Sequence, residues 1–228
     1  MDDRLLSCEK ADTSAEGGEY AVTFETAGVL RFSYEETAEY CLYDTGRTLE
    51  LDALLTAVTE ARMKRFIIPY CAFTRRTERQ IYDRLLEKFS GVNGYSGVWA
   101  PYVEPSAAGV VDFLKERGYA GDNAYCAAYI KSRADKNVSG NFIAAELIKR
   151  GVERQAAFRA VAEAGLDESD ACRRALEKKA NGMRIEKDEN GCVPQKTRAA
   201  LVRFLLSRGF DTGLAVDAVD EYIDGIRD

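Results

Sequence analysis

The residues whose types and spacing could do chemistry are the cations, the carboxylate pairs and the cysteines, because the chain contains no histidine. That absence removes the commonest general base, the Ser-His and Cys-His nucleophile pairs, and every zinc site with a histidine ligand. The carboxylate pairs Glu35-Glu36 and Asp188-Glu189 lie in polar stretches without a ligand partner at helical spacing. We expect these pairs on a solvated surface, and we expect no enzyme activity, no metal and no cofactor.

The six cysteines include no C-x-x-C pair, which argues against metal knuckles and thioredoxin-like redox sites. Cys71, Cys126 and Cys172 fall among apolar neighbours in helical patterns, where a reduced cysteine behaves as a small core residue. No apolar run approaches the ~18 residues of a membrane span. The acidic start, Met1-Asp2-Asp3-Arg4, lacks the apolar segment of a secretory signal. We therefore predict a reduced, cytoplasmic protein that does not contact a membrane.

The net charge of -6 is distributed unevenly along the chain. Residues 1–60 carry a net charge of -10, residues 61–210 carry +9, and residues 211–228 carry -5. A basic middle between acidic ends favours a polyanionic partner, or a protein that carries one, contacted by the middle only. The alternative is a solvated helical face.

Basic residues recur where helices are expected to begin. The N-terminus of a helix is already positive, so cations there do not serve helix stability and instead suggest contact with phosphate or with an acidic protein. The candidate binding residues are Arg75, Arg76, Arg79, Lys131, Arg133, Lys136, Lys196 and Arg198. A second set lies at the opposite helix ends, where the dipole favours cations and a purely structural role suffices. This set is Lys88, Lys149, Arg150 and Arg208.

Helices must position these cations, because everything after about residue 50 has the pattern of helix and loop, and a threefold repeat organises it. Thr77, Ser139 and Thr197 each resemble an N-cap residue, and only Thr77 has the partner, Gln80, that completes a capping box. Four and eight residues later come apolar positions on one helix face. These positions are Ile81, Ile143 and Leu201, then Leu85, Leu147 and Leu205. Gly151 and Gly209 are natural helix stops.

We therefore predict a mainly α protein with three tandem three-helix repeats in an elongated, solenoid-like array, preceded by a small β-hairpin segment. The expected helices are 51–73, 77–89 and 105–117; then 122–133, 140–150 and 153–164; then 168–181, 196–208 and 212–226. A break near Pro69 is also considered.

The predicted parts are a mobile acidic leader (1–18), a β-containing segment (19–50), repeat 1 (51–117, with a loop insertion at 90–104), repeat 2 (118–165) and repeat 3 (166–228, with a loop insertion at 182–194). The β segment has strand periodicity from Tyr20 to Phe24 and from Val29 to Tyr34, followed by a short helix at 35–43. The glycine-rich stretch 90–99 lacks the Gly-Lys-Ser/Thr of a phosphate loop, so we interpret it as a flexible insertion. We expect Trp99 to pack onto a neighbouring helix.

Four stretches resemble the RecX regulatory proteins. Tyr119–Arg133 resembles the Asp-x-x-Tyr/Phe-Ala-x-x-Tyr-Val-x-x-Arg helix of that family, and Ser139–Val152 is similar to its Gly-x-x-x-Ile-x-x-Glu-Leu-x-x-Lys-Gly-Ile segment. Thr77–Lys88 is similar to the Ser/Thr-Glu-x-x-Leu-x-x-x-Leu run of its first repeat, and Leu201–Phe210 resembles its closing segment. The likeness covers about residues 60–226, and the order and spacing of the stretches make it specific.

The resemblance implies a modulator of the RecA recombinase, active in DNA repair and the SOS response. Such proteins bind the RecA filament on single-stranded DNA, limit its growth or promote its disassembly, and thereby suppress ATPase, recombination and coprotease activity. We expect a monomer whose eight candidate cations contact the filament or DNA electrostatically, with weak direct DNA binding open. The alternative is a helical-repeat nucleic-acid-binding module that does not act on RecA.

Overall fold

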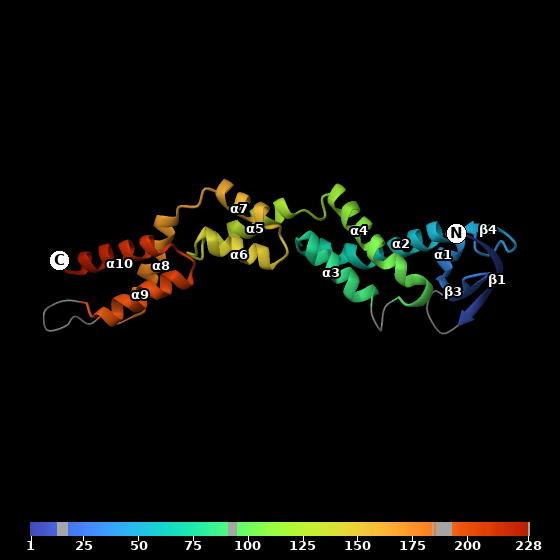
Figure 1. Cartoon of the computed structure of the whole chain (residues 1–228), viewed down its shortest axis with the longest axis horizontal. Coiled ribbons are helices and arrows are strands. Elements are labelled where there is room, and N and C mark those ends of the chain that lie inside the picture. Colours follow the sequence, from blue (N-terminus) through green and yellow to red (C-terminus); the bar gives the residue numbers. More distant parts are fainter. Residues whose placement is uncertain (13–17, 91–94, 184, 186–192, 228) are drawn as a thin grey trace. The chain divides into compact units, whose positions relative to one another are not determined.

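The structure, a computed structural model, describes residues 1–12, 18–90, 95–183, 185 and 193–227 (Figure 1). These residues form a four-stranded sheet and ten α-helices. The chain divides into two compact units. Unit 1 contains residues 1–75 and 81–120, and unit 2 contains residues 76–80 and 121–228. The mainly helical fold with a small N-terminal β segment confirms the predicted fold class, whereas the arrangement of the repeats as an array stays a prediction.

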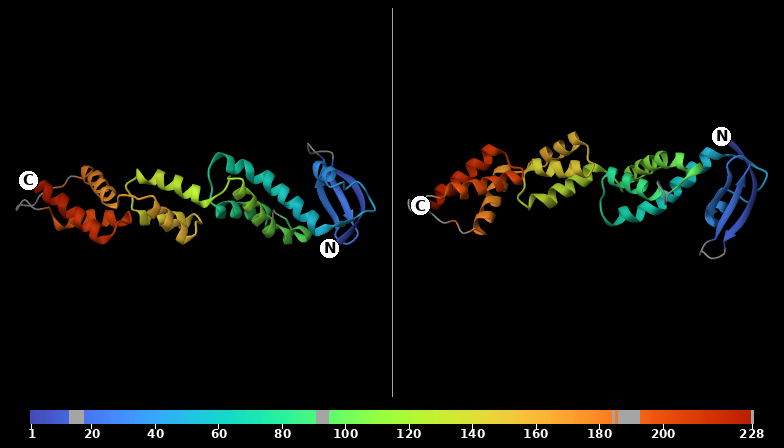
Figure 2. Two further views of the ribbon diagram at one scale, coloured as in Figure 1. Left: turned by 90° about the horizontal axis from the view of Figure 1, so that it is seen from above. Right: turned by 60° about the horizontal axis from the view of Figure 1, so that its bottom comes forward.

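An antiparallel sheet in the order β3-β2-β1-β4 opens unit 1. Its strands are β1 (Asp2–Asp12), β2 (Glu19–Phe24), β3 (Gly28–Ser33) and β4 (Thr48–Glu50). The predicted β2–β3 hairpin is confirmed, but the predicted mobile leader is wrong for the residues of β1, which pair with both β2 and β4. Residues 13–17 of the predicted leader (1–18) lie outside the described residues. Figure 2 shows the strands lying next to the start of α2 (Leu51–Phe73).

Buried Asp3 holds β1 to the hairpin turn. Its carboxylate accepts hydrogen bonds from the backbone amides of Arg4 (2.9 Å), Thr26 (2.9 Å) and Ala27 (2.8 Å). Burial by itself would raise the pKa of Asp3, but these hydrogen bonds lower it below its ordinary value. Asp3 is charged and is buried only because it binds the amides of a turn more than 20 residues away. The sequence of residues 2–12 therefore lacks the alternating apolar pattern that predicts a strand.

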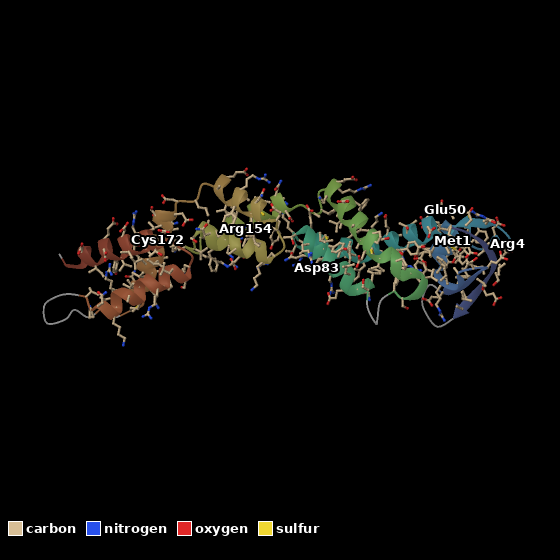
Figure 3. All side chains as sticks on the ribbon, viewed as in Figure 1. Met1, Arg4, Glu50, Asp83, Arg154 and Cys172 are labelled. Carbon is tan, nitrogen blue, oxygen red and sulfur yellow. The ribbon has the colours of Figure 1, made fainter. Side chains whose placement is uncertain are left out.

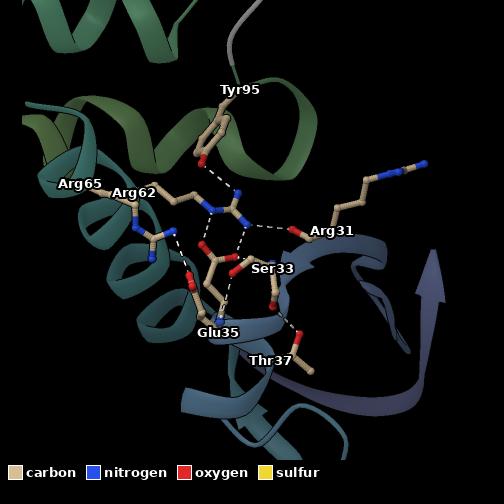
Figure 4. A network of polar contacts seen from close by, with 8 residues as sticks. Arg31, Ser33, Glu35, Thr37, Arg62, Arg65 and Tyr95 are labelled. Atoms are coloured by element: carbon tan, nitrogen blue, oxygen red, sulfur yellow. Dashed lines mark hydrogen bonds and ion pairs between the residues drawn. The ribbon is translucent and has the colours of Figure 1, made fainter. Parts of the chain in front are cut away.

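Glu36 connects the β segment to the first long helix through Arg62. Figure 4 shows Arg62 beside Arg31, Ser33 and Tyr95. Helix α1 (Tyr34–Glu39) begins with a capping box between Ser33 and Glu36. Glu36 is only 3% exposed, and its carboxylate receives Arg62 Nε at 2.6 Å and Nη2 at 2.5 Å. The prediction of a solvated surface is therefore wrong for Glu36, because the partner that permits its burial lies on α2. Asp188-Glu189 lies outside the described residues.

The Arg62 guanidinium uses its remaining donors within unit 1. Nη1 donates to Tyr95 Oη at 2.9 Å, and Nη2 donates to the carbonyl of Arg31 at 3.0 Å. The Trp99 ring lies 4.9 Å from the guanidinium carbon and 5.6 Å from the Phe32 ring. Trp99 therefore packs on α2, as predicted, and also on strand β3.

The first three long helices form a triplet around one core. After α2 come α3 (Glu78–Phe89), a 3-10 turn (Gly97–Trp99) and α4 (Ala100–Glu116). Helix α2 continues through Pro69 without a break. Helix α4 begins five residues before the expected start at 105, so the described end of the predicted 90–104 insertion is helical; residues 91–94 lie outside the description.

Two further triplets follow in unit 2, each with its own apolar core. The second contains α5 (Asp122–Ala134), α6 (Gly140–Lys149) and α7 (Arg154–Glu163). The third contains α8 (Glu168–Asn181), α9 (Gln195–Ser207) and α10 (Thr212–Arg227). Residues 184 and 186–192 of the predicted 182–194 insertion lie outside the description.

The positions that the repeat pattern singled out occupy the cores. Six apolar residues at matching places are 0% exposed: Ile81, Leu85, Ile143, Leu147, Leu201 and Leu205. Thr77 and Ser139 cap their helices as predicted. Thr197 does not: α9 begins at Gln195, because the carbonyl of Pro194 accepts from the amides of Thr197 and Arg198 and so extends the helix toward its N-terminus.

The three core cysteines behave as predicted. Cys71, Cys126 and Cys172 are buried and form no disulfide with another described residue, and Figure 3 marks Cys172 on α8. Burial raises the pKa of Cys172 to about 11. Such a thiol is protonated at neutral pH and is therefore a poor nucleophile.

Two junctions within unit 2 share one design. In the first, the Thr77 hydroxyl donates to the carbonyl of Arg150 at 2.8 Å, and the Glu78 amide donates to Asp122 Oδ1 at 3.1 Å. In the second, the Ser139 amide donates to the carbonyl of Arg208 at 3.1 Å. The Gly140 amide also donates to Glu168 Oε1 there, at 2.6 Å. In both junctions a carbonyl and a carboxylate from later in the chain bind the N-terminus of an earlier helix. That helix is α3 in the first junction and α6 in the second.

Ser139→Ala tests the second junction. The Ser139 hydroxyl accepts the Phe142 amide at 3.0 Å, and the residue is 1% exposed. We expect a loss of about 0.5–2 kcal/mol in the free energy of unfolding, measured by urea denaturation. The control is Ser132→Ala on the exposed side of α5, for which we expect a change within about 0.5 kcal/mol. Equal losses in both variants would contradict a capping role.

Candidate functional site

A groove of about 740 Å³ lies at the second junction of unit 2, where α5, α6, α8 and α9 meet. We call it the junction groove. Its lining residues are Arg133, Asp135, Lys136, Asn137, Val138, Phe142, Glu146, Ala175, Lys178, Lys179, Phe204, Ser207 and Arg208. Five of these residues are cationic and two are acidic, so the groove has a positive balance that suits an anionic ligand.

The junction fixes the backbone on both sides of the groove. Arg208 is the C-cap residue of α9, and its carbonyl holds the amide of Ser139. Its Nη1 donates to the carbonyl of Lys136 at 2.8 Å. Gly209 has a φ of 83°, and a Cβ atom there would lie 2.6 Å from the Ser139 hydroxyl. The absence of a side chain at Gly209 therefore permits the close approach that forms the groove.

A tyrosine and a glutamate orient Arg133. Its Nε and Nη2 donate to Tyr129 Oη at 2.9 and 2.8 Å, and Nη2 also donates to Glu146 Oε1 at 2.9 Å. Oε2 of Glu146 is buried and has no hydrogen-bond partner among the described residues. The Arg133 guanidinium therefore binds Tyr129 and Glu146, whereas Oε2 of Glu146 accepts no hydrogen bond from another described residue.

Aromatic rings add an apolar surface to the groove. Phe142 and Phe204 are both partly buried. The Phe204 ring lies 4.9 Å from the Arg208 guanidinium carbon and 5.5 Å from Lys179 Nζ, which places two cations within cation–π range. Cations beside aromatic rings are typical of surfaces that bind single-stranded nucleic acid.

Of the eight predicted binding residues, the structure brings Arg133 and Lys136 into the junction groove. Lys131 instead lines a pocket between α5 and α7, beside Ile130 and Arg159. Lys196 is exposed at the start of α9. These positions do not form one cluster with the groove.

Arg198 is occupied in a bidentate ion pair. Its Nε and Nη2 each lie 2.7 Å from a carboxylate oxygen of Asp220, and these hydrogen bonds raise the pKa of Arg198 and lower that of Asp220. This geometry indicates a link between α9 and α10.

The three remaining candidates, Arg75, Arg76 and Arg79, lie at the connection between α2 and α3. Arg75 belongs to unit 1 and is exposed, whereas Arg76 and Arg79 belong to unit 2. Arg79 packs at the first junction, since a Cβ atom at Gly151 would lie 2.4 Å from the Arg79 Cβ.

Sequence reasoning missed Lys178, Lys179 and Arg208. All three lie near helix C-termini, where the macrodipole already explains a cation, so their positions suggested no ligand. For Arg208 the helix dipole by itself predicts a structural role. Two adjacent lysines, Lys178 and Lys179, at the end of α8 indicate a candidate anion-binding position. Only the structure shows that they line a groove with residues of α5, α6 and α9.

Comparisons with known proteins find relatives of one kind, although no protein-family model matches the chain. Regulatory protein RecX of Clostridium perfringens (strain 13 / Type A) is 30% identical over 139 residues, which cover 60% of this chain and 58% of that protein. Regulatory protein RecX of Clostridium botulinum (strain Eklund 17B / Type B) is 28% identical over 152 residues, covering 65% and 63%. The chain is therefore similar in sequence to RecX regulatory proteins. It spans about three fifths of the length of these RecX relatives.

Solved RecX structures have the same fold. A crystal structure of regulatory protein RecX has a TM-score of 0.57 at 15% identity and covers 93% of this chain and 96% of that one. RecX from Lactobacillus salivarius has a TM-score of 0.56 at 17% identity, covering 74% of this chain and 98% of that one. These likenesses show that the chain has the fold of the solved RecX structures. They do not identify a ligand of the junction groove.

Within the described part of the chain, no group of cysteine and acidic residues could hold a metal ion. The same residues include no helix long and apolar enough to cross a membrane. The arrangement of the junction groove is that of a binding surface: cations, aromatic rings and a carboxylate acceptor.

Proposed function

We propose that this chain is a RecX-type regulator that binds the RecA filament on single-stranded DNA and mainly restrains it. Filament growth, ATPase, recombination and coprotease activity are expected to fall when it binds. The observation that carries the proposal is the sequence match to proteins named regulatory protein RecX, supported by the shared fold. All eight predicted cations remain candidate contacts, and the junction groove adds Lys178, Lys179 and Arg208.

Electrostatics supports a polyanionic partner. Cations that neutralise DNA phosphates release condensed counterions, so binding through them weakens steeply as salt increases. The junction groove provides such cations on two consecutive triplets of unit 2. Several weak contacts on one chain reinforce one another, because binding at one raises the effective concentration at the next.

The test is the single-stranded-DNA-dependent ATPase of RecA, with this protein titrated from far below the RecA concentration. Inhibition at substoichiometric ratios is expected, since a protein that stops filament growth acts on many subunits. Inhibition that requires stoichiometric protein would contradict restraint of growth, and the absence of inhibition would remove the proposed function.

Charge reversal tests the role of the groove. The double variant Lys136→Glu/Lys178→Glu changes two exposed cations of the groove, and we expect about tenfold weaker filament binding and a smaller salt slope. The matched control, Lys88→Glu/Lys149→Glu, makes the same change in net charge at exposed positions outside the groove. Anisotropy with labelled filaments measures both variants, and equal weakening would assign the effect to net charge alone.

A second candidate function is a nucleic-acid-binding module that does not act on RecA. The observation that favours it is the pairing of Phe204 with Lys179 and Arg208, which suits a single strand without any protein partner. It predicts tight, salt-sensitive binding to bare oligonucleotides together with an unchanged RecA ATPase.

A further inference from the structure

Unit 2 contains another groove, of about 570 Å³, between α5 and α7. Figure 1 shows these two helices side by side. We call this space the basic groove. Its apolar floor is formed by Ile130, Leu166 and alanines of both helices. Each bank carries one exposed cation, Lys131 on α5 and Arg159 on α7. The groove therefore combines an apolar floor with positive charge on two sides.

The third triplet has a groove in the equivalent place, between α8 and α10, with carboxylates where the basic groove has cations. Lys131 lies nine residues after Asp122 (122 to 131), which supplies the carboxylate of the first junction. Glu177 lies nine residues after Glu168 (168 to 177), which supplies the carboxylate of the second junction. Glu177 lines the α8–α10 groove, so Lys131 and Glu177 are equivalent positions with opposite charge.

The cation on the other bank is replaced in the same way. Arg159 lies nine residues after Arg150 (150 to 159), whose carbonyl accepts a hydrogen bond in the first junction. Asp217 lies nine residues after Arg208 (208 to 217), whose carbonyl accepts one in the second junction, and it lines the α8–α10 groove. Two consecutive triplets thus fold with opposite charges at both positions, so folding does not require cations in the basic groove.

The two cations are available to a partner. Lys131 and Arg159 are exposed, and neither forms a hydrogen bond or an ion pair with another described residue. Arg133, by contrast, donates to Tyr129 and Glu146. Exposed cations on both sides of an apolar floor suit an occupant that is apolar on one face and carries carboxylates at its edges.

We propose that the basic groove docks an acidic amphipathic helix of a partner protein. The helix lays its apolar side chains on the floor between α5 and α7, and its carboxylates contact Lys131 and Arg159. The alanines of the floor leave room for the larger side chains of the partner. The inference deepens the proposed function, because it assigns this groove to the protein of the RecA filament rather than to its DNA.

The length of the groove suits a helical segment. On α5 the lining extends from Asn123 to Ala134, which is about 16 Å along the helix axis. A partner helix of about three turns covers this length. Such a helix presents an apolar face through residues three and four positions apart.

A nucleic acid strand fits the basic groove less well. The described lining contains no aromatic side chain on which a base could stack. Glu163 lies one turn after Arg159 on α7 and would repel the phosphate that each nucleotide carries. A helix can place its carboxylates beside Lys131 and Arg159 and leave Glu163 to solvent. A nucleic acid is therefore an outcome that the test must separate from a protein segment.

The experiment measures the binding of a designed peptide to the full chain by fluorescence anisotropy. The labelled peptide has about fifteen residues, with leucine at helical spacing on one face and glutamate on the other. A reference peptide has the same residues in an order without a continuous apolar face. We expect the amphipathic peptide to bind about tenfold more tightly, because only its leucines can reach the floor together. Equal binding of the two peptides would overturn the inference.

Lys131→Glu/Arg159→Asp tests the charge of the groove. The α8–α10 groove carries these acidic residues at the equivalent positions, so we expect the variant to fold. It should bind the amphipathic peptide about tenfold more weakly, since two attractions become repulsions. The matched control, Lys149→Glu/Arg154→Asp, makes the same change in net charge at exposed positions outside the groove. Equal weakening in both variants would assign the effect to net charge and overturn the inference.

Ala127→Phe and Ala128→Phe test the shape of the groove. Both alanines are exposed on α5, but only Ala127 lines the groove. A phenylalanine at position 127 would fill part of the floor, so we expect about tenfold weaker peptide binding, whereas Ala128→Phe should stay within about twofold of the wild type. Thermal unfolding accompanies every variant, and the charge variants decide alone if Ala127→Phe does not fold. Equal binding by the two folded phenylalanine variants would contradict docking in the groove.

An unlabelled oligonucleotide of about twelve thymines distinguishes a nucleic acid from a protein segment. We expect it to leave the labelled peptide bound, because the basic groove offers no stacking surface. Displacement as effective as that by unlabelled peptide would assign the groove to a nucleic acid and overturn the inference.

The RecA ATPase separates this inference from the proposed function. Equal inhibition of RecA by the wild type and by Lys131→Glu/Arg159→Asp would refute the assignment of the groove to the filament protein and leave the proposed function standing. Selective binding of the amphipathic peptide by a chain that does not inhibit RecA would support the ligand of the groove and refute the proposed function.

Discussion

Arg62→Ala is expected to destabilise unit 1 by about 3–5 kcal/mol, because it leaves the carboxylate of Glu36 buried without its cation. Glu36 is 3% exposed and the Arg62 side chain is 22% exposed, so solvent cannot replace the lost partner. The substitution also removes donors from Tyr95 Oη and from the carbonyl of Arg31. Urea denaturation followed by Trp99 fluorescence reports the change directly, since Trp99 packs on the guanidinium.

The neighbouring pair Arg65–Glu35 is the matched control. Its side chains are 61% and 71% exposed at a separation of 3.3 Å, and we expect Arg65→Ala to cost no more than about 1 kcal/mol. A loss in Arg62→Ala as small as that in Arg65→Ala would show that the burial of Glu36 does not depend on Arg62.

The same pair predicts a pH dependence of stability. Burial alone would raise the pKa of Glu36, but hydrogen bonds from Arg62 and from the Ser33 amide lower it below its ordinary value of 4.5. The unfolded state therefore binds the proton more readily than the folded state does. The stability from this pair is complete above pH 4.5 and is lost as the pH falls through the lowered pKa. Arg62→Ala should remove most of this dependence on acid.

Gly209→Ala is expected to destabilise the second junction by about 2–4 kcal/mol, through a left-handed backbone and overpacking together. The φ of Gly209 is 83°, and the added Cβ would lie 2.6 Å from the Ser139 hydroxyl and 2.9 Å from the Phe142 Cβ. Thermal unfolding measures the loss. Because Phe142 lines the junction groove, oligonucleotide binding should weaken as well.

Gly118→Ala separates the two causes. Gly118 has a φ of 74°, but nothing lies within 4 Å of an added Cβ, so this variant carries only the backbone penalty of about 1–2 kcal/mol. A loss of stability in Gly209→Ala no larger than that in Gly118→Ala would show that the close contacts with Ser139 and Phe142 add nothing to the backbone penalty.

The helices and their core positions were predictable, because helical periodicity is a local property of the sequence. Ile143 and Leu147 form one face regardless of what packs against them, and Ser139 caps the helix that it precedes. Strand β1 was missed because its residues are held by distant partners. Glu36 was misassigned for the same reason, since Arg62 lies 26 residues away.

The candidate site was predictable only in part. Arg133 and Lys136 were predicted correctly as groove residues, because they lie in the basic stretch that precedes α6 in the sequence. Lys178 and Lys179 were missed because a cation near a helix C-terminus has a sufficient local explanation. One oxygen of Glu146 is buried without a donor among the described residues, and no spacing of residues in a sequence reveals that.

The shared design of the two junctions has a consequence for synthesis on the ribosome. The backbone amides at the start of α6 donate to Glu168 and to the carbonyl of Arg208, which are synthesised after α6. The hydrogen-bond partners of the start of α3, Asp122 and the carbonyl of Arg150, are likewise synthesised after α3. These donors at the start of each earlier helix are therefore left to water until the following triplet has left the exit tunnel. Nascent chains arrested before Arg208 should expose the start of α6 to protease, and chains released beyond it should protect that start.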